Sequence, residues 1–254
     1  MSFFAKVNQQ EEFPLPEGVK TLQIQGFNGS ITWEPLGGGA GRIVAEKEVS
    51  GLSARGLEQI LAALRVEDES TPGKKVLRAV KPPNMPLLVN AKVAFTIYAS
   101  SEQIRELQAQ TSNGAIKLEV PFSGKMSLRT SNGRIQLRGG QGEVEATTSN
   151  GRIEFGKLQL QGTSSLRTSN GQIAGQVEFA QEGRYSFETS NGAIELRVPR
   201  DTPGSFRAKS SNGQIEFNLE GDHAVGRKEV AIQRSPSPSV TLATSNGAIS
   251  VVGY

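Results

Sequence analysis

Thr111-Ser112-Asn113-Gly114-Ala115-Ile116 is the stretch of sequence that decides the fold. The tripeptide Ser-Asn-Gly occurs seven times between residues 112 and 247, nearly always with Thr before it and Ile two residues after Gly. Successive glycines of these motifs stand 19, 18, 20, 21, 21 and 34 residues apart. A period near twenty residues is typical of architectures in which one small unit stacks on the next. The segment Asn28-Gly29-Ser30-Ile31 resembles the motif and is a degenerate eighth copy.

The residues on either side of the motif alternate between apolar and polar, which is the pattern of a half-buried strand. Counted from Asn, positions −6, −4 and −2 are predicted to face inward, and so are positions +3 and +5. In the second copy these are Met126, Leu128, Thr130, Ile135 and Leu137. The inward parity changes across Asn-Gly, and a strand cannot change parity without a bend. We therefore expect a corner between two strands at each Asn-Gly pair, where both residues tolerate a left-handed backbone.

Two all-β architectures fit this corner. The first is a single β-solenoid of about seven to eight coils of roughly 20 residues, in which each strand pairs in parallel with its equivalent in the next coil. The second is an antiparallel β-hairpin meander, in which Asn-Gly is a type I′ turn and Thr130 lies opposite Ile135. We favour the solenoid, because Thr, Asn and Ile recur at fixed positions, as expected where like residues stack about 4.8 Å apart.

The first 106 residues have a different pattern. Residues 1–17 are predicted to be an N-terminal arm, and residues 18–106 to be capping strands with the chain's one helix, at 53–66. Ser53 is its expected N-cap, and its buried face comprises Leu57, Ile60, Leu61 and Leu64. Residues 107–254 form the repeat body, in which the 34-residue spacing is expected to hold an extra strand at 229–233 and a protruding loop. Earlier strands are expected at 21–27, 42–49, 76–80 and 91–98.

These features together resemble the bacterial putative adhesin family designated domain of unknown function 4097. The resemblance rests on Phe27-Asn28-Gly29-Ser30-Ile31, helix 53–66, strand 91–98 and the train of Ser-Asn-Gly-x-Ile units. The family often has Ser-Gly-Asp at the corner, where this chain has Ser-Asn-Gly. The resemblance implies a β-solenoid from an envelope-associated or surface protein, without agreed catalytic residues. It therefore implies a non-enzymatic structural or interaction module with an unknown protein or glycan partner.

Composition excludes several classes of function. The chain has no cysteine and one histidine, His223, which excludes disulfides, thiolate chemistry, a two-histidine metal site and a conventional Ser-His-Asp triad on the repeats. No phosphate-loop motif is present, so we predict no catalytic, cofactor-binding or metal-binding residue. No window approaches the roughly 18 apolar residues that span a bilayer. A complete chain of this kind is expected in the cytoplasm, and a chain trimmed of a signal segment in the cell envelope.

The candidate binding site is a basic stripe on outward positions near the corner. Between residues 117 and 167 the chain has 8 basic and 4 acidic side chains. Stacked cations of this kind can hold a polyanion, such as an acidic glycan or a nucleic-acid backbone, and a glycan-active enzyme on the same face is the rival from another class. A charged, solvated face is the competing interpretation, because aromatic residues do not alternate with the cations. Contacts between the ends or faces of two copies are a further predicted association. The stripe comprises Lys117, Arg129, Arg134, Arg138, Arg152 and Arg167.

Overall fold

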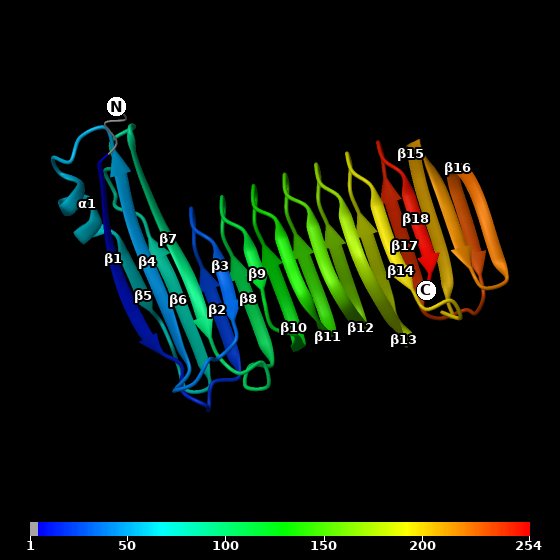
Figure 1. The fold of residues 1–254 in the computed structure, drawn as a ribbon, viewed down its shortest axis with the longest axis horizontal. Coiled ribbons are helices and arrows are strands. Elements are labelled where there is room, and N and C mark those ends of the chain that lie inside the picture. The colour runs from blue at the N-terminus through cyan, green and yellow to red at the C-terminus, as the bar shows by residue number, and fades with distance from the viewer. Residues whose placement is uncertain (1–4) are drawn as a thin grey trace.

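The computed structural model describes residues 5–254 and shows an elongated all-β molecule with one short helix (Figure 1). The first four residues of the predicted arm lie outside the described residues. The elements are β1 (Ala5–Pro14), β2 (Thr21–Gln25), β3 (Ile31–Glu34), β4 (Arg42–Gly51), α1 (Leu57–Ala63), β5 (Arg65–Asp68), β6 (Lys74–Val80), β7 (Val89–Tyr98), β8 (Glu106–Gln110), β9 (Ile116–Leu118), β10 (Phe122–Arg129), β11 (Ile135–Thr147), β12 (Ile153–Arg167), β13 (Ile173–Glu188), β14 (Ile194–Val198), β15 (Ser205–Leu219), β16 (Asp222–Gln233), β17 (Ser239–Thr244) and β18 (Ile249–Gly253).

Strands of neighbouring repeats pair in parallel and in register. β10 pairs with β8 on one side and with β11 on the other, and Leu128 lies between Ala109 and Ala146. On the other side of the corner, Ile135 of β11 lies between Ile116 of β9 and Ile153 of β12. The two strands that flank an Asn-Gly corner thus bond to other repeats. The antiparallel hairpin meander does not describe these repeats.

The strands form two rows that pack face to face and meet at the corners. The pre-corner row contains the strands that lead into an Asn-Gly pair, such as β2, β8 and β10, and the post-corner row contains those that leave it, such as β3 and β9. The long strands β11, β12 and β13 belong to both rows, because each continues from the post-corner row into the pre-corner row.

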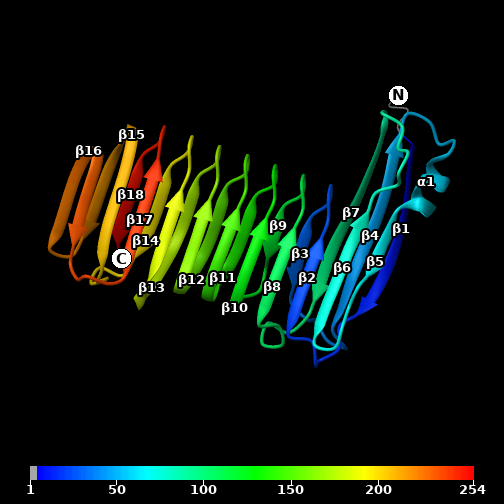
Figure 2. The ribbon, with the colours of Figure 1, turned by 180° about the vertical axis from the view of Figure 1, so that it is seen from behind.

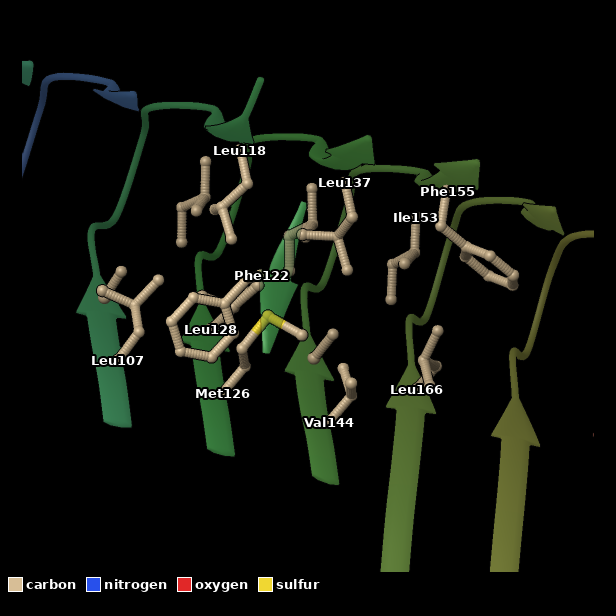
Figure 3. Packing of buried hydrophobic residues seen from close by; sticks show 14 of the residues in the cluster. Leu107, Leu118, Phe122, Met126, Leu128, Leu137, Val144, Ile153, Phe155 and Leu166 are labelled. Carbon is tan, nitrogen blue, oxygen red and sulfur yellow. The ribbon is translucent and has the colours of Figure 1, made fainter. Parts of the chain in front are cut away.

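The core fills the space between the two rows, as the alternation predicts. Side chains such as Leu107, Met126 and Val144 from one row point toward Leu118 and Leu137 from the other (Figure 3). A fully buried aliphatic side chain contributes about 1.5–3 kcal/mol to stability, so these stacked rows supply most of the hydrophobic stabilisation. The predicted isoleucine row is confirmed, with every member at most 1% exposed: Ile31, Ile116, Ile135, Ile153, Ile173, Ile194, Ile215 and Ile249.

The N-terminal end is built from antiparallel strands. In the post-corner row β1 pairs with β4, and β4 pairs with β7, which joins the repeats through β3. In the pre-corner row β5 pairs with β6, which joins them through β2. The described part of the predicted arm is thus mostly strand β1, paired with β4. The predicted strands 21–27, 42–49, 76–80 and 91–98 correspond to β2, β4, β6 and β7.

The helix is shorter than the predicted span 53–66. Gly56, and not Ser53, is its N-cap, because Gly56 has a φ of 84° that a helical residue cannot adopt. The chain is extended again from Arg65 onward. The predicted buried face is nevertheless present, since Leu57 and Leu64 are at most 1% exposed.

The C-terminal end departs from the order of the sequence. β16 runs antiparallel along the whole of β15, so the strand predicted at 229–233 is longer and follows a tight turn at Gly221. The last strands, β17 and β18, then return between earlier strands and do not extend the stack (Figures 1 and 2).

Candidate functional site

The asparagines of the corners form one continuous ladder of side-chain hydrogen bonds. Each Asn Nδ2 donates to the Oδ1 of the preceding Asn in space, over 2.5–2.9 Å. Asn28 belongs to the ladder, which confirms the degenerate eighth copy. The spatial order is Asn28, Asn113, Asn132, Asn150, Asn170, Asn191, Asn246 and Asn212.

The corner glycines are required by a close approach of backbones. A Cβ on Gly133 would lie 1.8 Å from the carbonyl oxygen of Gly114, and the other corner glycines are similarly confined. The expectation of a left-handed corner was wrong, because neither Asn132 nor Gly133 has a positive φ. The Thr at position −2 completes the contact: Thr130 Oγ1 donates to the Gly114 carbonyl at 2.9 Å, and Thr148 Oγ1 to the Gly133 carbonyl at 2.8 Å. The corner is therefore structural.

The structure divides the predicted basic stripe among three places. Lys117 and Arg138 project from the post-corner row, Arg129 and Arg167 from the pre-corner row, and Arg134 and Arg152 lie in the corners. The sequence pattern does not reveal this division. The corner turns the cations that precede it and the cations that follow it onto opposite faces of the molecule.

Three of the six cations are neutralised by carboxylates. Arg129 pairs with Glu145, Arg152 with Glu154 at 3.2 Å, and Arg167 with Glu188 at 2.8 Å. Within residues 5–254, the remaining three, Lys117, Arg134 and Arg138, make no ion pair. Lys117 lies on β9, which pairs directly with β11; Arg138 lies on β11, and Arg134 lies in the corner just before it. We call these three side chains the unpaired basic trio.

A hollow of about 340 Å³ lies on the pre-corner row over β2, β8 and β10. Ser127 is a small side chain between Gln108 and Glu145 in one cross-strand row, so the surface dips there. Four glutamines on two paired strands supply amides to the hollow: Gln23, Gln25, Gln108 and Gln110. This site was not predicted from the sequence, although the glutamines at outward positions of β2 and β8 are visible in the sequence.

The charges around the hollow balance. Two carboxylates, Glu106 and Glu145, and two cations, Lys125 and Arg129, line it, and Arg129 pairs with Glu145. Gln108 Nε2 donates to Glu106 Oε1 at 2.9 Å, and Ser127 Oγ donates to Glu145 Oε2 at 3.3 Å. The hollow therefore offers many donors and acceptors and has no net charge.

The N-terminal end contains buried lysines that sequence reasoning also missed. Lys75 is 5% exposed, lies 2.6 Å from Asp68 and stands over the ring of Phe13. Burial by itself raises the pKa of Asp68, but hydrogen bonds from Lys75 and Ser70 outweigh it, and the pKa lies below its usual value. This ion pair joins the end of β5 to the start of β6, with Lys75 buried and Asp68 at the surface.

In residues 5–254 no group of three or more His, Asp or Glu side chains is placed to hold a metal ion. His223 is an exposed residue of β16 opposite Asn218. The helix that the structure describes is too short to cross a membrane.

No protein-family model matches the sequence, and no curated protein matches it. Membership of the family that the sequence resembles therefore stays a prediction. Solved structures similar to this chain include a putative adhesin from Parabacteroides distasonis, with 9% identity, a TM-score of 0.48 and 97% of each chain covered. A putative adhesin from Bacteroides fragilis has 13% identity, a TM-score of 0.47 and 98% of each chain covered. A putative lipid binding protein from Parabacteroides distasonis has 12% identity, a TM-score of 0.43 and 96% of each chain covered. Similarities at this level carry no conclusion about ligand or activity.

Proposed function

We propose that this chain is a β-solenoid that serves as a non-enzymatic interaction module of the adhesin type, with residues 18–106 as its cap and 107–254 as its body. The observation that carries the proposal is the polar hollow over β2, β8 and β10. It lies where the cap strands meet the repeats, since β2 pairs with both β6 and β8. Rigid neighbouring strands hold its side chains in fixed positions.

The ligand class we assign to the hollow is a neutral, hydroxyl-rich molecule such as an uncharged glycan. Each glutamine amide offers both a donor and an acceptor, which matches a sugar hydroxyl group. The balance of Glu106 and Glu145 against Lys125 and Arg129 gives no electrostatic preference for an anion. Among residues 5–254 no aromatic side chain lines the hollow, so recognition rests on hydrogen bonds and the expected affinity per site is modest.

Filling the hollow tests this proposal. Neutral oligosaccharides that bind on an array would be titrated against the protein and against Ser127→Phe, whose ring would occupy the dip. Ser165→Phe is the matched control, because Ser165 lies in the same cross-strand row, two repeats away, outside the hollow. We expect at least a tenfold loss of affinity for Ser127→Phe and none for Ser165→Phe. Equal affinities for both variants would exclude the hollow as the site.

The same incubation separates binding from catalysis. A bound glycan recovered after prolonged contact with the protein is expected to have its original mass. Shortened products that disappear in a variant of the hollow would instead establish a glycan-active enzyme.

A second candidate function is polyanion binding at the unpaired basic trio. The observation that favours it is the absence, within residues 5–254, of ion pairs to Lys117 and Arg138, which lie on the paired strands β9 and β11, and to Arg134 in the corner before β11. Replacing these three residues with Ala is expected to abolish binding to heparin or single-stranded DNA and to flatten its salt dependence. Replacement of the paired cations Arg129, Arg152 and Arg167 is the control, with a smaller expected loss. Equal losses, or no binding by the unaltered protein, would reject this candidate.

A further inference from the structure

The end of the chain lies inside the stack of repeats. β17 pairs in parallel with β13 on one side and with β15 on the other, and β18 lies between β14 and β15 in the same way (Figures 1 and 2). The asparagine ladder has the same order, because Asn246 donates to Asn191 and Asn212 donates to Asn246, each at 2.7 Å. We call residues 239–253 the inserted repeat, and the space they fill the slot.

Both walls of the slot are bonding edges. On one wall, the backbone N–H groups of Thr189 and Ile194 donate to the inserted repeat, each at 2.9 Å. On the opposite wall, Asn212 N–H donates to the carbonyl oxygen of Ser245 at 2.9 Å. Without the inserted repeat, these walls would present two unpaired parallel edges, which is the usual template for adding a strand. The slot therefore selects a segment that can bond on both sides at once.

The side chains of the slot match the inserted repeat in size. Val240 lies between Tyr185 and Phe206, and all three are at most 2% exposed. The ring of Phe179 packs against both aromatic neighbours, with centroids 4.8 Å from Tyr185 and 6.1 Å from Phe206. Val240 thus lies between two large rings, and both rings also pack against Phe179. This arrangement gives the slot a definite width and shape.

A short tether joins the inserted repeat to the rest of the chain. Gln233, the last residue of β16, and Ser239, the first of β17, lie on opposite sides of Ser205. Arg234 anchors the start of the tether, because its guanidinium donates to three backbone carbonyls within 2.9 Å. Only residues 235–238 separate this anchor from the inserted repeat. The segment can therefore leave its own slot when these four residues rearrange; Pro236 is exposed, Ser235 and Ser237 are half-buried, and Pro238 is buried.

We propose that the slot accepts the inserted repeat of a second copy of this chain, so that two molecules exchange residues 239–253 and form a closed, symmetric pair. Each copy contains the same slot and the same segment, so the exchange keeps every contact described above. Because each molecule both gives and receives one segment, the pair leaves no slot empty and does not grow into a fibre. This proposal is independent of any ligand in the hollow.

Shortening the tether tests the exchange. Deletion of residues 236–238 leaves two residues to span two strand spacings, about 10 Å, around β15. Three Cα–Cα steps reach at most about 11 Å, so insertion into the same chain becomes strained. We expect the shortened chain to have a dimeric mass by light scattering at concentrations where the unaltered chain is monomeric. A chain lacking residues 37–39, in the loop between β3 and β4, is the control and is expected to stay monomeric. A folded, monomeric shortened chain would overturn the proposal.

A second measurement uses two full-length chains and does not depend on folding of the shortened one. One chain is spin-labelled at Ser190→Cys and the other at Ser245→Cys, which are adjacent positions in the stack because Ser245 N–H bonds to the Ser190 carbonyl. After joint unfolding and refolding at high concentration, exchange brings labels on different chains within about 5 Å, and dipolar broadening is expected. The pair Ser112→Cys with Ser245→Cys is the control and is expected to show none. Native strand content without broadening in the first mixture would refute the exchange.

Discussion

Gly133 shows how a single residue type controls the corner. Its Cα packs on the carbonyl oxygen of Gly114, which also accepts a hydrogen bond from Thr130. In each such corner, one glycine carbonyl oxygen accepts a hydrogen bond from a buried Thr hydroxyl. The glycine of the next repeat packs against the same oxygen, which is possible because that glycine has no Cβ. The repeat of Thr and Gly in the sequence reports this contact between successive repeats.

The first prediction concerns the missing Cβ. Gly133→Ala is expected to lower the free energy of unfolding by about 1–3 kcal/mol or more, because the methyl group collides with backbone that cannot move aside cheaply. Gly37→Ala is the control, since a Cβ there meets nothing within 4 Å and Gly37 has no positive φ. Urea unfolding of both variants measures the difference. Similar midpoints for the two would show that the backbones are not in contact at the corner.

The second prediction concerns the buried hydroxyl. Thr148→Val keeps the shape of the side chain but removes the donor to the Gly133 carbonyl and the acceptor for Gly151 N–H. We expect a loss of about 1–3 kcal/mol in unfolding free energy, because two buried polar groups lose their partner. Thr148→Ser retains the hydroxyl and is expected to lose less. If Val and Ser cost the same, the hydroxyl contributes nothing.

For single residues, the sequence predicted which side chains are buried, but it did not predict which hydrogen bonds they make. Alternation alone identified inward residues such as Leu128 and Ile135, because a strand has only two faces. The Thr hydrogen bond was not predicted, since a hydroxyl on an inward position gives no sign of which carbonyl it will meet. The left-handed corner was wrong for a related reason: Gly adopts positive and negative φ about equally readily, and the contact with the neighbouring repeat decides which is present.

Among the elements, α1 and β16 are the two whose bounds the sequence predicted poorly. The apolar spacing identified the buried face of α1, but Gly56 delayed its start. The strand at 229–233 was expected without its first half, because Asp222 to Lys228 lack clear alternation in the sequence. Edge strands need only one partner, so the pattern in their sequence is weaker.

The third prediction concerns the ion pair at the N-terminal end. The pKa of Asp68 is lowered in the folded protein, so its contribution to stability is present above the unfolded value and is lost as the pH falls through the folded value. Asp68→Asn leaves Lys75 buried without its carboxylate and is expected to be less stable than the unaltered protein at pH 7. This difference is expected to shrink below about pH 4. Asp201→Asn, at an exposed position, is the control. Urea midpoints at pH 7 and pH 3 provide the measurement, and a constant difference across this range would contradict the assignment.

On the scale of the whole molecule, the equivalence of the repeats explains what the sequence could not predict. A period near twenty residues predicts that repeats stack. All repeats offer equivalent strand edges, however, so the sequence pattern does not indicate the order in which they stack. Nothing in the spacing indicates that Asn246 lies between Asn191 and Asn212. The hollow is also a product of the assembly, because its glutamines come from strands more than eighty residues apart in the sequence.

The parallel stacking of repeats is the central claim, and one distance tests it. The chain has no cysteine, so spin labels can be placed at Ser112→Cys and Ser190→Cys, two exposed corner positions. Four successive backbone contacts connect these corners, so parallel stacking predicts a backbone separation of about 19 Å. In a hairpin meander each repeat adds two strands to the sheet, and the same positions would lie about 38 Å apart. A pulsed electron paramagnetic resonance distance near 19 Å is the expected result, and one near 38 Å would contradict the account.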